Sequence, residues 1–316
     1  MNPPIPFLAA PGYAATQQWI IALQQAMPGE RIVTFSQLND ADKAACTLAI
    51  VANPSPADLK QLPELRWVHS VWAGVERLVA EFKQTQAELK IVRLIDPQLA
   101  ETMAEAVLAW TLYLHRDMPS YTRQQRQKRW QPLPVVRAQE RTVGLLGLGV
   151  LGEAAAQRLH AANFKVRGWS RERKALVNVE CFAGAAELQS MLAATDILIC
   201  LLPLTEHTTG LLNAQILSWL PAGASLINFA RGPIIDDAAL LSALDSGHIS
   251  HAVLDVFAVE PLPEDQWQWA HPKVTVLPHC SAPTHHQTAS AIVASNIQAF
   301  RSSGLIPASV DTRTGY

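Results

Sequence analysis

The sequence predicts an α/β protein with two domains, each built on a parallel sheet. An apolar run at 142–148 is followed by closely spaced glycines and then by an amphipathic, alanine-rich helix. Short apolar runs alternate with helical segments from residue 5 to about residue 96, and the alternation resumes after Lys174. Strands that alternate with helices are typical of parallel sheets, and 316 residues are enough for two buried cores.

Composition and charge are those of an ordinary globular protein. Hydrophobic residues make up 49% and charged residues 16%, and the net charge of −2 argues against a general nucleic-acid or anionic-membrane surface. The N-terminus lacks the features of a secretory signal, and no apolar run is long enough to span a bilayer. The cysteines form no CxxC pair and suit reduced thiols: Cys46, Cys181, Cys200 and Cys280. We therefore expect a soluble, cytoplasmic protein.

The glycines after the apolar run have separate functions in binding a dinucleotide. Gly147 permits a tight turn, Gly149 lets the backbone approach a pyrophosphate, and Gly152 lets the helix lie close to the strand. The phosphates are expected at the free N–H groups at the start of the helix, around Val150 and Leu151. Structural turns also produce this motif, but here a second predicted strand follows at the expected distance.

The residues after that second strand indicate which dinucleotide binds. NAD sites usually place Asp or Glu there for the ribose hydroxyls, whereas this chain has Ser170 followed by Arg171, Arg173 and Lys174. A carboxylate would repel a 2′-phosphate and the cations would hold one, so the segment favours NADP(H), with NADPH preferred over NADH. A solvated basic turn is the alternative.

A long helical stretch at 97–129, interrupted near Pro119, connects the two domains. Its apolar residues recur at helical spacing and predict a buried face: Met103, Ala106, Val107, Trp110 and Leu114. The polar tail that follows contains Trp130 and is either a solvated arm or a segment that docks on a second subunit. The sequence favours neither.

Polar residues follow three predicted strands of the second domain, where open α/β sheets bind ligands. Arg231 ends one strand and can offer a fork to a carboxylate while it polarises a carbonyl. Asp255 and Glu260 flank the turn after the next strand, and His279 follows the last one. Each residue alone has a common structural explanation. Together they indicate an acid–base centre beside an anion-binding arginine.

These motifs, taken together, resemble those of the NAD(P)-dependent D-2-hydroxyacid dehydrogenases, and the resemblance covers most of the sequence. The segments that carry it are GLLGLGVLGEAAAQRL, LLPLTEHTTGLLN, NFARGPIIDDAAL, LDVFAVEPLP and LPHCSAP. The basic turn WSRERK, the segment WQPLP and the C-terminal VDTRTGY are similar to the glyoxylate/hydroxypyruvate reductase A branch. The resemblance implies two Rossmann-like domains with parallel sheets and a homodimer. The dinucleotide-binding domain, 98–283, would be inserted in a smaller flavodoxin-like substrate domain, 1–97 and 284–316.

The resemblance also implies roles for individual residues. Arg231 would bind and polarise the substrate, and His279 would act as acid and base with Glu260 as its partner. The backbone amides of Ala73 and Gly74 would bind the substrate carboxylate. Asp255 would contact the nicotinamide carboxamide, and further cofactor contacts would come from other strand ends: Leu202, Pro203 and Ala230.

The substrate loop departs from the family pattern. In the family this loop usually reads Gly-Ala-Gly-Val-Asp. In this chain the first residue of the loop is Trp72 and the last is Glu76. We expect the indole of Trp72 to line and narrow the acid pocket. The alternative is an indole buried in the core of the small domain. Cys280, beside His279, is given no role.

The implied reaction reduces glyoxylate to glycolate and hydroxypyruvate to D-glycerate by hydride transfer from NADPH to C2. Protonated His279 donates a proton to the carbonyl oxygen while Arg231 stabilises its negative charge, and Glu260 keeps the imidazolium available near neutral pH. No metal is needed, and no common zinc pattern is formed by His279, Cys280, His285 and His286.

Other functions on the same fold stay open. One is a non-catalytic NADP(H)-sensing or corepressor-like binding protein, because fold alone does not decide function. Another is a D-2-hydroxyacid dehydrogenase with a different substrate preference. The presence of Arg231, Glu260 and His279 together favours an enzyme, and an assay with glyoxylate and NADPH discriminates the two classes.

Overall fold

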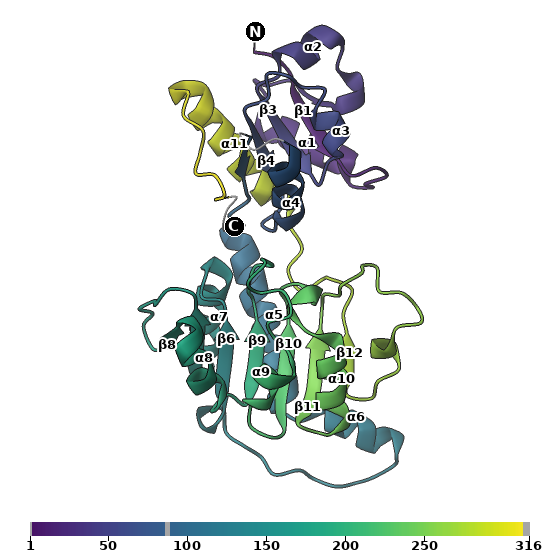
Figure 1. Cartoon of the computed structure of the whole chain (residues 1–316), viewed down its shortest axis with the longest axis vertical. Coiled ribbons are helices and arrows are strands. Elements are labelled where there is room, and N and C mark those ends of the chain that lie inside the picture. Colours follow the sequence, from purple (N-terminus) through teal and green to yellow (C-terminus); the bar gives the residue numbers. More distant parts are fainter. Residues whose placement is uncertain (1, 86–88, 312–316) are drawn as a thin grey trace. The chain divides into compact units, whose positions relative to one another are not determined.

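The computed structural model describes residues 2–85 and 89–311. The chain divides into two compact units, one formed by Met1–Gln98 with Thr284–Tyr316 and the other by Leu99–Pro283. The end of the C-terminal segment that resembles the reductase A branch, 312–316, lies outside the described residues. Figure 1 shows the helices and strands of both units and labels most of them.

The first unit contains a five-stranded parallel sheet in the order β2-β1-β3-β4-β5. Its elements are β1 (Ile5–Ala9), α1 (Thr16–Ala26), β2 (Ile32–Thr34), η1 (Phe35–Gln37), α2 (Asp40–Ala45), β3 (Leu48–Ala52), α3 (Pro56–Leu59), β4 (Trp67–Ser70), α4 (Glu76–Thr85), β5 (Lys90–Val92) and α11 (His286–Ser303). The last helix therefore returns from the end of the chain to a unit that is formed mainly by its beginning.

Strand β3 shows how this sheet is buried on both faces. All five of its residues are buried, and successive side chains point to opposite faces. Ile50 packs into a core with residues of α1 and α11, whereas Val51 packs into a second core with residues of α3 and α4. Two buried faces account for the continuous apolar run LAIVA.

His69 on β4 is a buried polar residue of this unit. Its Nδ1–H donates to the carbonyl of Ser70 at 2.8 Å, so its Nε2 accepts a hydrogen bond from the side-chain amide of Asn296 at 2.9 Å. Burial lowers the pKa of His69 to about 4, against the smaller opposing effect of the Ser70 hydrogen bond. The folded protein therefore holds this imidazole neutral.

We expect this histidine to make the fold sensitive to acid. The unfolded chain takes up a proton near pH 6.5, whereas folded His69 stays neutral down to about pH 4. The contribution of His69 to the free energy of unfolding is therefore fully present above pH 6.5. It falls by roughly 3 kcal/mol as the pH falls to 4. Urea unfolding at several pH values should show a shallower acid loss in His69→Gln than in the wild type. An equal loss in both proteins would contradict the assignment.

The second unit contains a seven-stranded parallel sheet in the order β12-β11-β10-β9-β6-β7-β8. Its elements are α5 (Pro97–His115), α6 (Met118–Arg126), η2 (Ala138–Glu140), β6 (Thr142–Leu146), α7 (Val150–Ala161), β7 (Lys165–Ser170), β8 (Glu180–Ala183), α8 (Gly184–Leu192), β9 (Ile197–Cys200), α9 (Ala214–Ser218), β10 (Ala224–Asn228), η3 (Gly232–Ile234), α10 (Asp237–Asp245), β11 (Ile249–Leu254), η4 (Trp267–Trp269) and β12 (Val274–Val276). The order reverses between β9 and β6, so ligands are expected at the carboxyl edge there.

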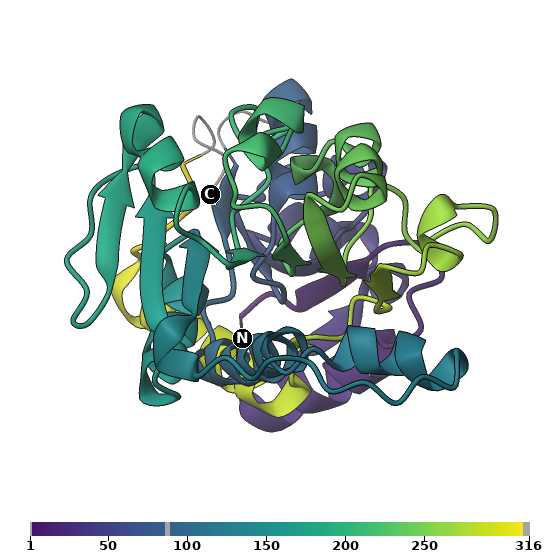
Figure 2. The ribbon, with the colours of Figure 1, turned by 90° about the horizontal axis from the view of Figure 1, so that it is seen from below.

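Helices cover both faces of this second sheet. Ile199 of β9 packs with residues of α5 and α7, whereas Leu198 packs with residues of α8, α9 and α10. Figure 2 shows green helices on one side of the strands and α6, in blue-teal, on the other. Pro119, the predicted interruption of the long helix, lies in the first turn of α6. The predicted architecture of two parallel α/β sheets is confirmed.

No helix in the described part of the chain is both long enough and apolar enough to cross a bilayer.

Candidate active site

The three predicted catalytic residues follow three neighbouring strands. Arg231 comes after β10, Glu260 after β11 and His279 after β12. These strands are adjacent and parallel in the order β12-β11-β10, so their carboxyl ends meet at one edge of the sheet. The glycines after β6 lie at the same edge of the same sheet.

His279 and Glu260 form a hydrogen-bonded pair. The distance from His279 Nδ1 to Glu260 Oε2 is 2.7 Å. The other oxygen of this carboxylate accepts the N–H of Phe257 at 2.9 Å, which fixes the carboxylate against its own turn. Because the carboxylate binds Nδ1–H, Nε2 is left for chemistry. About half of the His279 side chain is exposed, so Nε2 is within reach of a ligand.

Asp255 holds the backbone that carries His279. One of its carboxylate oxygens accepts the N–H of Cys280 at 2.8 Å, and the other accepts the N–H of Ser281 at 3.0 Å. His279 itself adopts a left-handed backbone with φ of 51°. Asp255 is buried, and these bonds give it a clear role in shaping the turn. Its contact with a nicotinamide carboxamide stays a prediction.

Arg231 is positioned by Asn228, which the sequence analysis did not single out, and by the backbone of Ala230. The buried Asn228 donates from its amide to the carbonyl of Arg231 at 3.1 Å and accepts the N–H of Ala230 at 3.1 Å. The guanidinium of Arg231 donates from Nη1 to the carbonyl of Ala230 at 2.7 Å. The signal that could have predicted these two hydrogen bonds is an asparagine at the end of a buried strand.

Gly232, next to Arg231, lies directly against the backbone of the turn that carries Glu260. A Cβ at this glycine would lie 2.0 Å from the carbonyl carbon of Phe257 and 2.3 Å from the nitrogen of Ala258. Only a residue without a side chain allows the two backbones to come so close. Arg231 and Glu260 are therefore carried by segments in direct backbone contact.

The glycine motif has the geometry that a dinucleotide site requires. Gly147 has φ of +102°, and a Cβ on Gly152 would lie 1.9 Å from the carbonyl oxygen of Gly147. A Cβ on Gly149, by contrast, would meet no atom within 4 Å. Gly149 is the N-cap of α7, so open space lies in front of the free N–H groups of Val150 and Leu151. The residues present therefore fit a bound pyrophosphate.

The basic turn after β7 is braced by one of its own arginines. Arg173 donates from Nη1 to the carbonyl of Cys181 at 2.8 Å and forms an ion pair with Glu187. Glu187 also accepts the N–H of Ala183 at 2.7 Å. Arg171 contacts the exposed Glu172 at 3.5 Å, a weak surface pair. Ser170, Arg171 and Lys174 stay the predicted phosphate contacts.

The remaining predicted residues lie at further strand ends. Leu202 and Pro203 follow β9, which neighbours β6, and Pro203 accepts the hydroxyl of Thr208 at 2.7 Å through its carbonyl. Trp72, Ala73 and Gly74 follow β4 in the first unit, where all three are partly buried. Their predicted contacts with cofactor and substrate stay predictions.

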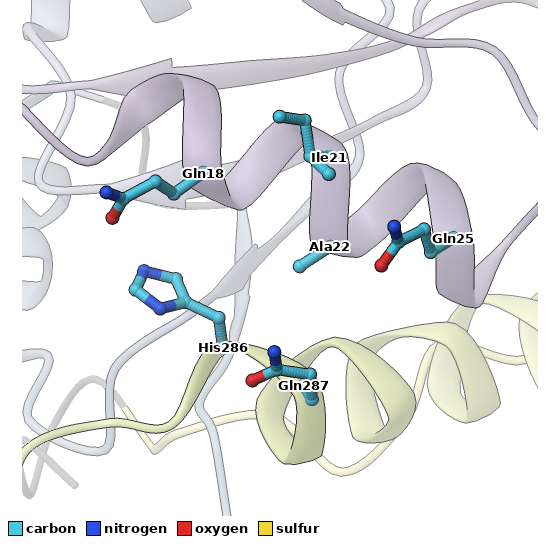
Figure 3. A pocket seen from close by; sticks show the side chains of 6 residues that line it. All are labelled: Gln18, Ile21, Ala22, Gln25, His286 and Gln287. Atoms are coloured by element: carbon cyan, nitrogen blue, oxygen red, sulfur yellow. The ribbon is translucent and has the colours of Figure 1, made fainter.

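Two hollows lie in the first unit, and no metal cluster is found in the described residues. No group of three or more His, Cys, Asp and Glu side chains there could hold a metal ion. One hollow, of about 300 Å³, lies between α1 and α11 and is lined by glutamines and His286 (Figure 3). The second, of about 660 Å³, lies at the carboxyl ends of β1 and β2.

The same stretch of chain that carries the glycine motif, Arg231 and His279 matches a known family. Residues 108–281 match the model for the D-isomer specific 2-hydroxyacid dehydrogenase, NAD binding domain. The chain belongs to this family. The predicted resemblance to the D-2-hydroxyacid dehydrogenases is thereby confirmed.

Solved structures of family members are similar over the whole chain. A D-isomer specific 2-hydroxyacid dehydrogenase from Xanthobacter autotrophicus Py2, in complex with NADPH and MES, is 40% identical with a TM-score of 0.92, and both chains are covered completely. The NADPH-dependent glyoxylate/hydroxypyruvate reductase from Sinorhizobium meliloti, in complex with NADP and sulfate, is 31% identical with a TM-score of 0.89, over 99% of this chain and 100% of that chain.

A third similar structure is a probable 2-hydroxyacid dehydrogenase from Rhizobium etli CFN 42, in complex with NADP, HEPES and L(+)-tartaric acid. It is 30% identical with a TM-score of 0.90, and both chains are covered completely. The present chain is thus an oxidoreductase of the D-2-hydroxyacid dehydrogenase family.

Proposed function

We propose that this dehydrogenase is an NADPH-dependent reductase of small 2-oxo acids, converting glyoxylate to glycolate and hydroxypyruvate to D-glycerate. The observation that carries the proposal is the His279–Glu260 pair at 2.7 Å, at the sheet edge where Arg231 also lies. The pair supplies a proton donor, and the arginine supplies a positive fork for an acid. The similarity to the Sinorhizobium meliloti glyoxylate/hydroxypyruvate reductase supports the substrate class.

The cofactor would be held by the glycine turn and the basic turn. The pyrophosphate would lie before the helix start at Val150 and Leu151, over Gly149. Ser170, Arg171 and Lys174 would surround the 2′-phosphate. Three similar structures contain NADPH or NADP, which supports the choice of NADP(H).

The chain's own residues would perform the proton and charge chemistry. NADPH supplies a hydride to C2 of the substrate when it is bound. Arg231 holds the carboxylate and stabilises the negative charge that develops on the carbonyl oxygen. His279 donates the proton to that oxygen from Nε2, since Glu260 binds its Nδ1. The bond to Glu260 also fixes the orientation of the imidazole ring.

A steady-state assay tests this proposal against a binding-only function. The purified protein should oxidise NADPH when glyoxylate or hydroxypyruvate is added, and the panel should include pyruvate and phenylpyruvate. A corepressor-like protein would bind NADPH without turnover of any acid. Turnover restricted to the other acids would keep the dehydrogenase chemistry and contradict the proposed substrates.

NADPH should lose its advantage over NADH in the double variant Ser170→Asp with Arg171→Ala. The change adds a negative charge and removes a cation beside the proposed 2′-phosphate, so the KM for NADPH should rise about 10- to 100-fold, on the order of 1.5–3 kcal/mol. The kcat with saturating cofactor should change little. Arg66→Ala, which removes an exposed cation from the first unit, is the matched control. An unchanged preference for NADPH over NADH in the double variant would contradict the assignment of Ser170 and Arg171 to the 2′-phosphate.

We also propose that the protein is a homodimer whose contact includes α6 and the arm after it. Figure 1 shows this arm as an extended loop below the second sheet, from α6 back to β6. Trp130 on the arm is 99% exposed, an unusual position for an indole in a monomer. Further exposed apolar residues of α6 and the arm are Met118, Tyr121 and Val135, and Leu112 is exposed near the end of α5.

Sedimentation velocity should show twice the mass of one chain, and Trp130→Ala should weaken the dimer. A monomer at micromolar concentration would refute this part of the proposal.

A further inference from the structure

Two aromatic rings from different loops of the first unit meet edge to face. Tyr13 lies in the loop between β1 and α1, and Trp72 lies in the loop after β4. Their ring centroids are 5.7 Å apart and their planes make an angle of 84°. This is a preferred geometry for two aromatic rings, because the positive edge of one ring meets the negative face of the other.

Tyr13 is fixed by the core of this unit. Its hydroxyl accepts the indole N–H of Trp19 at 3.2 Å, and its carbonyl accepts the hydroxyl of Thr16 at 2.8 Å. Trp19 is only 1% exposed and stacks on Phe7 with 6.4 Å between ring centroids. The orientation of the Tyr13 ring is therefore set by residues that a ligand does not move.

The backbone of Trp72 is fixed as well, so only its side-chain torsions can move the indole. Its N–H donates to the hydroxyl of Ser70 at 3.0 Å, and its carbonyl accepts the N–H of Leu94 at 3.1 Å. The indole is partly buried, and the edge-to-face contact with Tyr13 restricts its rotamers. Tyr13 therefore determines where the remaining surface of the indole is presented.

Tyr13 also lines the larger hollow of this unit. The hollow of about 660 Å³ lies at the carboxyl ends of β1 and β2, and its wall includes Pro11, Gly12, Tyr13, Thr34, Phe35 and Ser36. In the order β2-β1-β3 the switch point of the sheet, where open α/β sheets bind ligands, lies between β1 and β3, and Tyr13 follows β1 beside that point. Tyr13 thus belongs both to this hollow and to the pair with Trp72.

We propose that Tyr13 is a positioning residue for Trp72, and that the Tyr13–Trp72 pair limits the size of the substituent that a 2-oxo acid carries at C2. This inference rests on the proposed function. Trp72 immediately precedes Ala73 and Gly74, the proposed carboxylate-binding amides. The carboxylate and the substituent are both attached to C2, so a bulky ring beside the carboxylate site meets the substituent. The pair then favours small acids such as glyoxylate.

The competing explanation is that both rings only pack the core. In that case their replacement lowers stability, and substrates of different size are affected equally. Selectivity, measured as the ratio of kcat/KM for phenylpyruvate to kcat/KM for glyoxylate, distinguishes the two explanations. Thermal stability alone does not.

The test is a double-mutant cycle on this ratio in the full-length protein. Trp72→Gly should raise the ratio about tenfold, because it removes the indole from the proposed pocket. Tyr13→Leu keeps apolar bulk on the core but removes the ring edge, and should raise the ratio about fivefold. In the Trp72→Gly background the same Tyr13→Leu change should have no further effect. Tyr13→Phe keeps the ring and loses only the bond to Trp19, so its ratio should stay closer to wild type.

The outcomes separate the inference from the proposed function. An equal effect of Tyr13→Leu in both backgrounds, or no effect in a folded variant, overturns the positioning role. If Tyr13→Leu does not fold, Tyr13→Ala and Tyr13→Phe are compared in the same cycle, with melting temperatures measured first. A wild type that reduces no 2-oxo acid refutes the proposed function, and this inference falls with it. If the wild type reduces glyoxylate but neither Trp72→Gly nor Tyr13→Leu changes the selectivity ratio, this inference alone is refuted.

Discussion

Arg231→Lys should lower kcat/KM for glyoxylate by on the order of 2–4 kcal/mol, roughly 30- to 1000-fold. Lysine keeps the positive charge but cannot offer the planar fork that binds a carboxylate through two parallel hydrogen bonds. It also cannot reproduce the bond from Nη1 to the Ala230 carbonyl in the same geometry. Steady-state kinetics with saturating NADPH measures the loss.

Cofactor binding provides the internal control for this variant. The dissociation constant of NADPH should stay close to that of the wild type, because the glycine turn and the basic turn are unchanged. Arg301→Lys is a matched control, since Arg301 is a partly buried arginine that pairs with Glu30 in the first unit. It should leave kcat/KM nearly unchanged. Near-normal activity of Arg231→Lys would mean that Arg231 has only a structural role.

Glu260→Gln should lower kcat/KM for glyoxylate reduction about tenfold. The two carboxylate oxygens of Glu260 accept separate hydrogen bonds, one from the N–H of Phe257 and one from Nδ1 of His279. The single amide oxygen of glutamine cannot accept both, so it can keep the turn in place while the imidazole loses the partner that orients it for proton transfer. Steady-state kinetics with saturating NADPH measures the loss.

Oxidation of the hydroxy acid uses the same imidazole as a base, so its kcat/KM should fall as well. Glu264→Gln is the matched control, because Glu264 is an exposed acid in the same segment. A kcat/KM close to that of the wild type in Glu260→Gln would show that Glu260 is not the functional partner of His279.

Much of the fold could be predicted because hydrophobic periodicity reflects burial. Strands buried on both faces, such as Leu48–Ala52, give unbroken apolar runs, and the long helix Pro97–His115 repeats its apolar face over several turns. The helices Asp40–Ala45 and Glu76–Thr85 were not predicted. The first has only six residues, none of them buried, so packing leaves no pattern in its sequence.

The candidate site could be predicted where the chemistry depends on side chains that follow strands. His279 and Glu260 are far apart in sequence, and the parallel order of β11 and β12 accounts for their meeting. The groups that position the site were missed for two physical reasons. Asn228 acts through bonds to backbone atoms, and Gly232 acts by having no side chain at all. Neither function leaves a recognisable pattern in a single sequence.

The left-handed backbone at His279 means that the residue best for the proposed activity is not the residue best for thermal stability. A histidine at φ of 51° costs roughly 1 kcal/mol more than a glycine, which adopts this conformation freely. A screen for thermal stability alone would therefore favour glycine at this position, and it would discard the proposed proton donor. Laboratory evolution of a more robust enzyme from this scaffold has to select for turnover and stability together, because position 279 is one at which the two demands call for different residues.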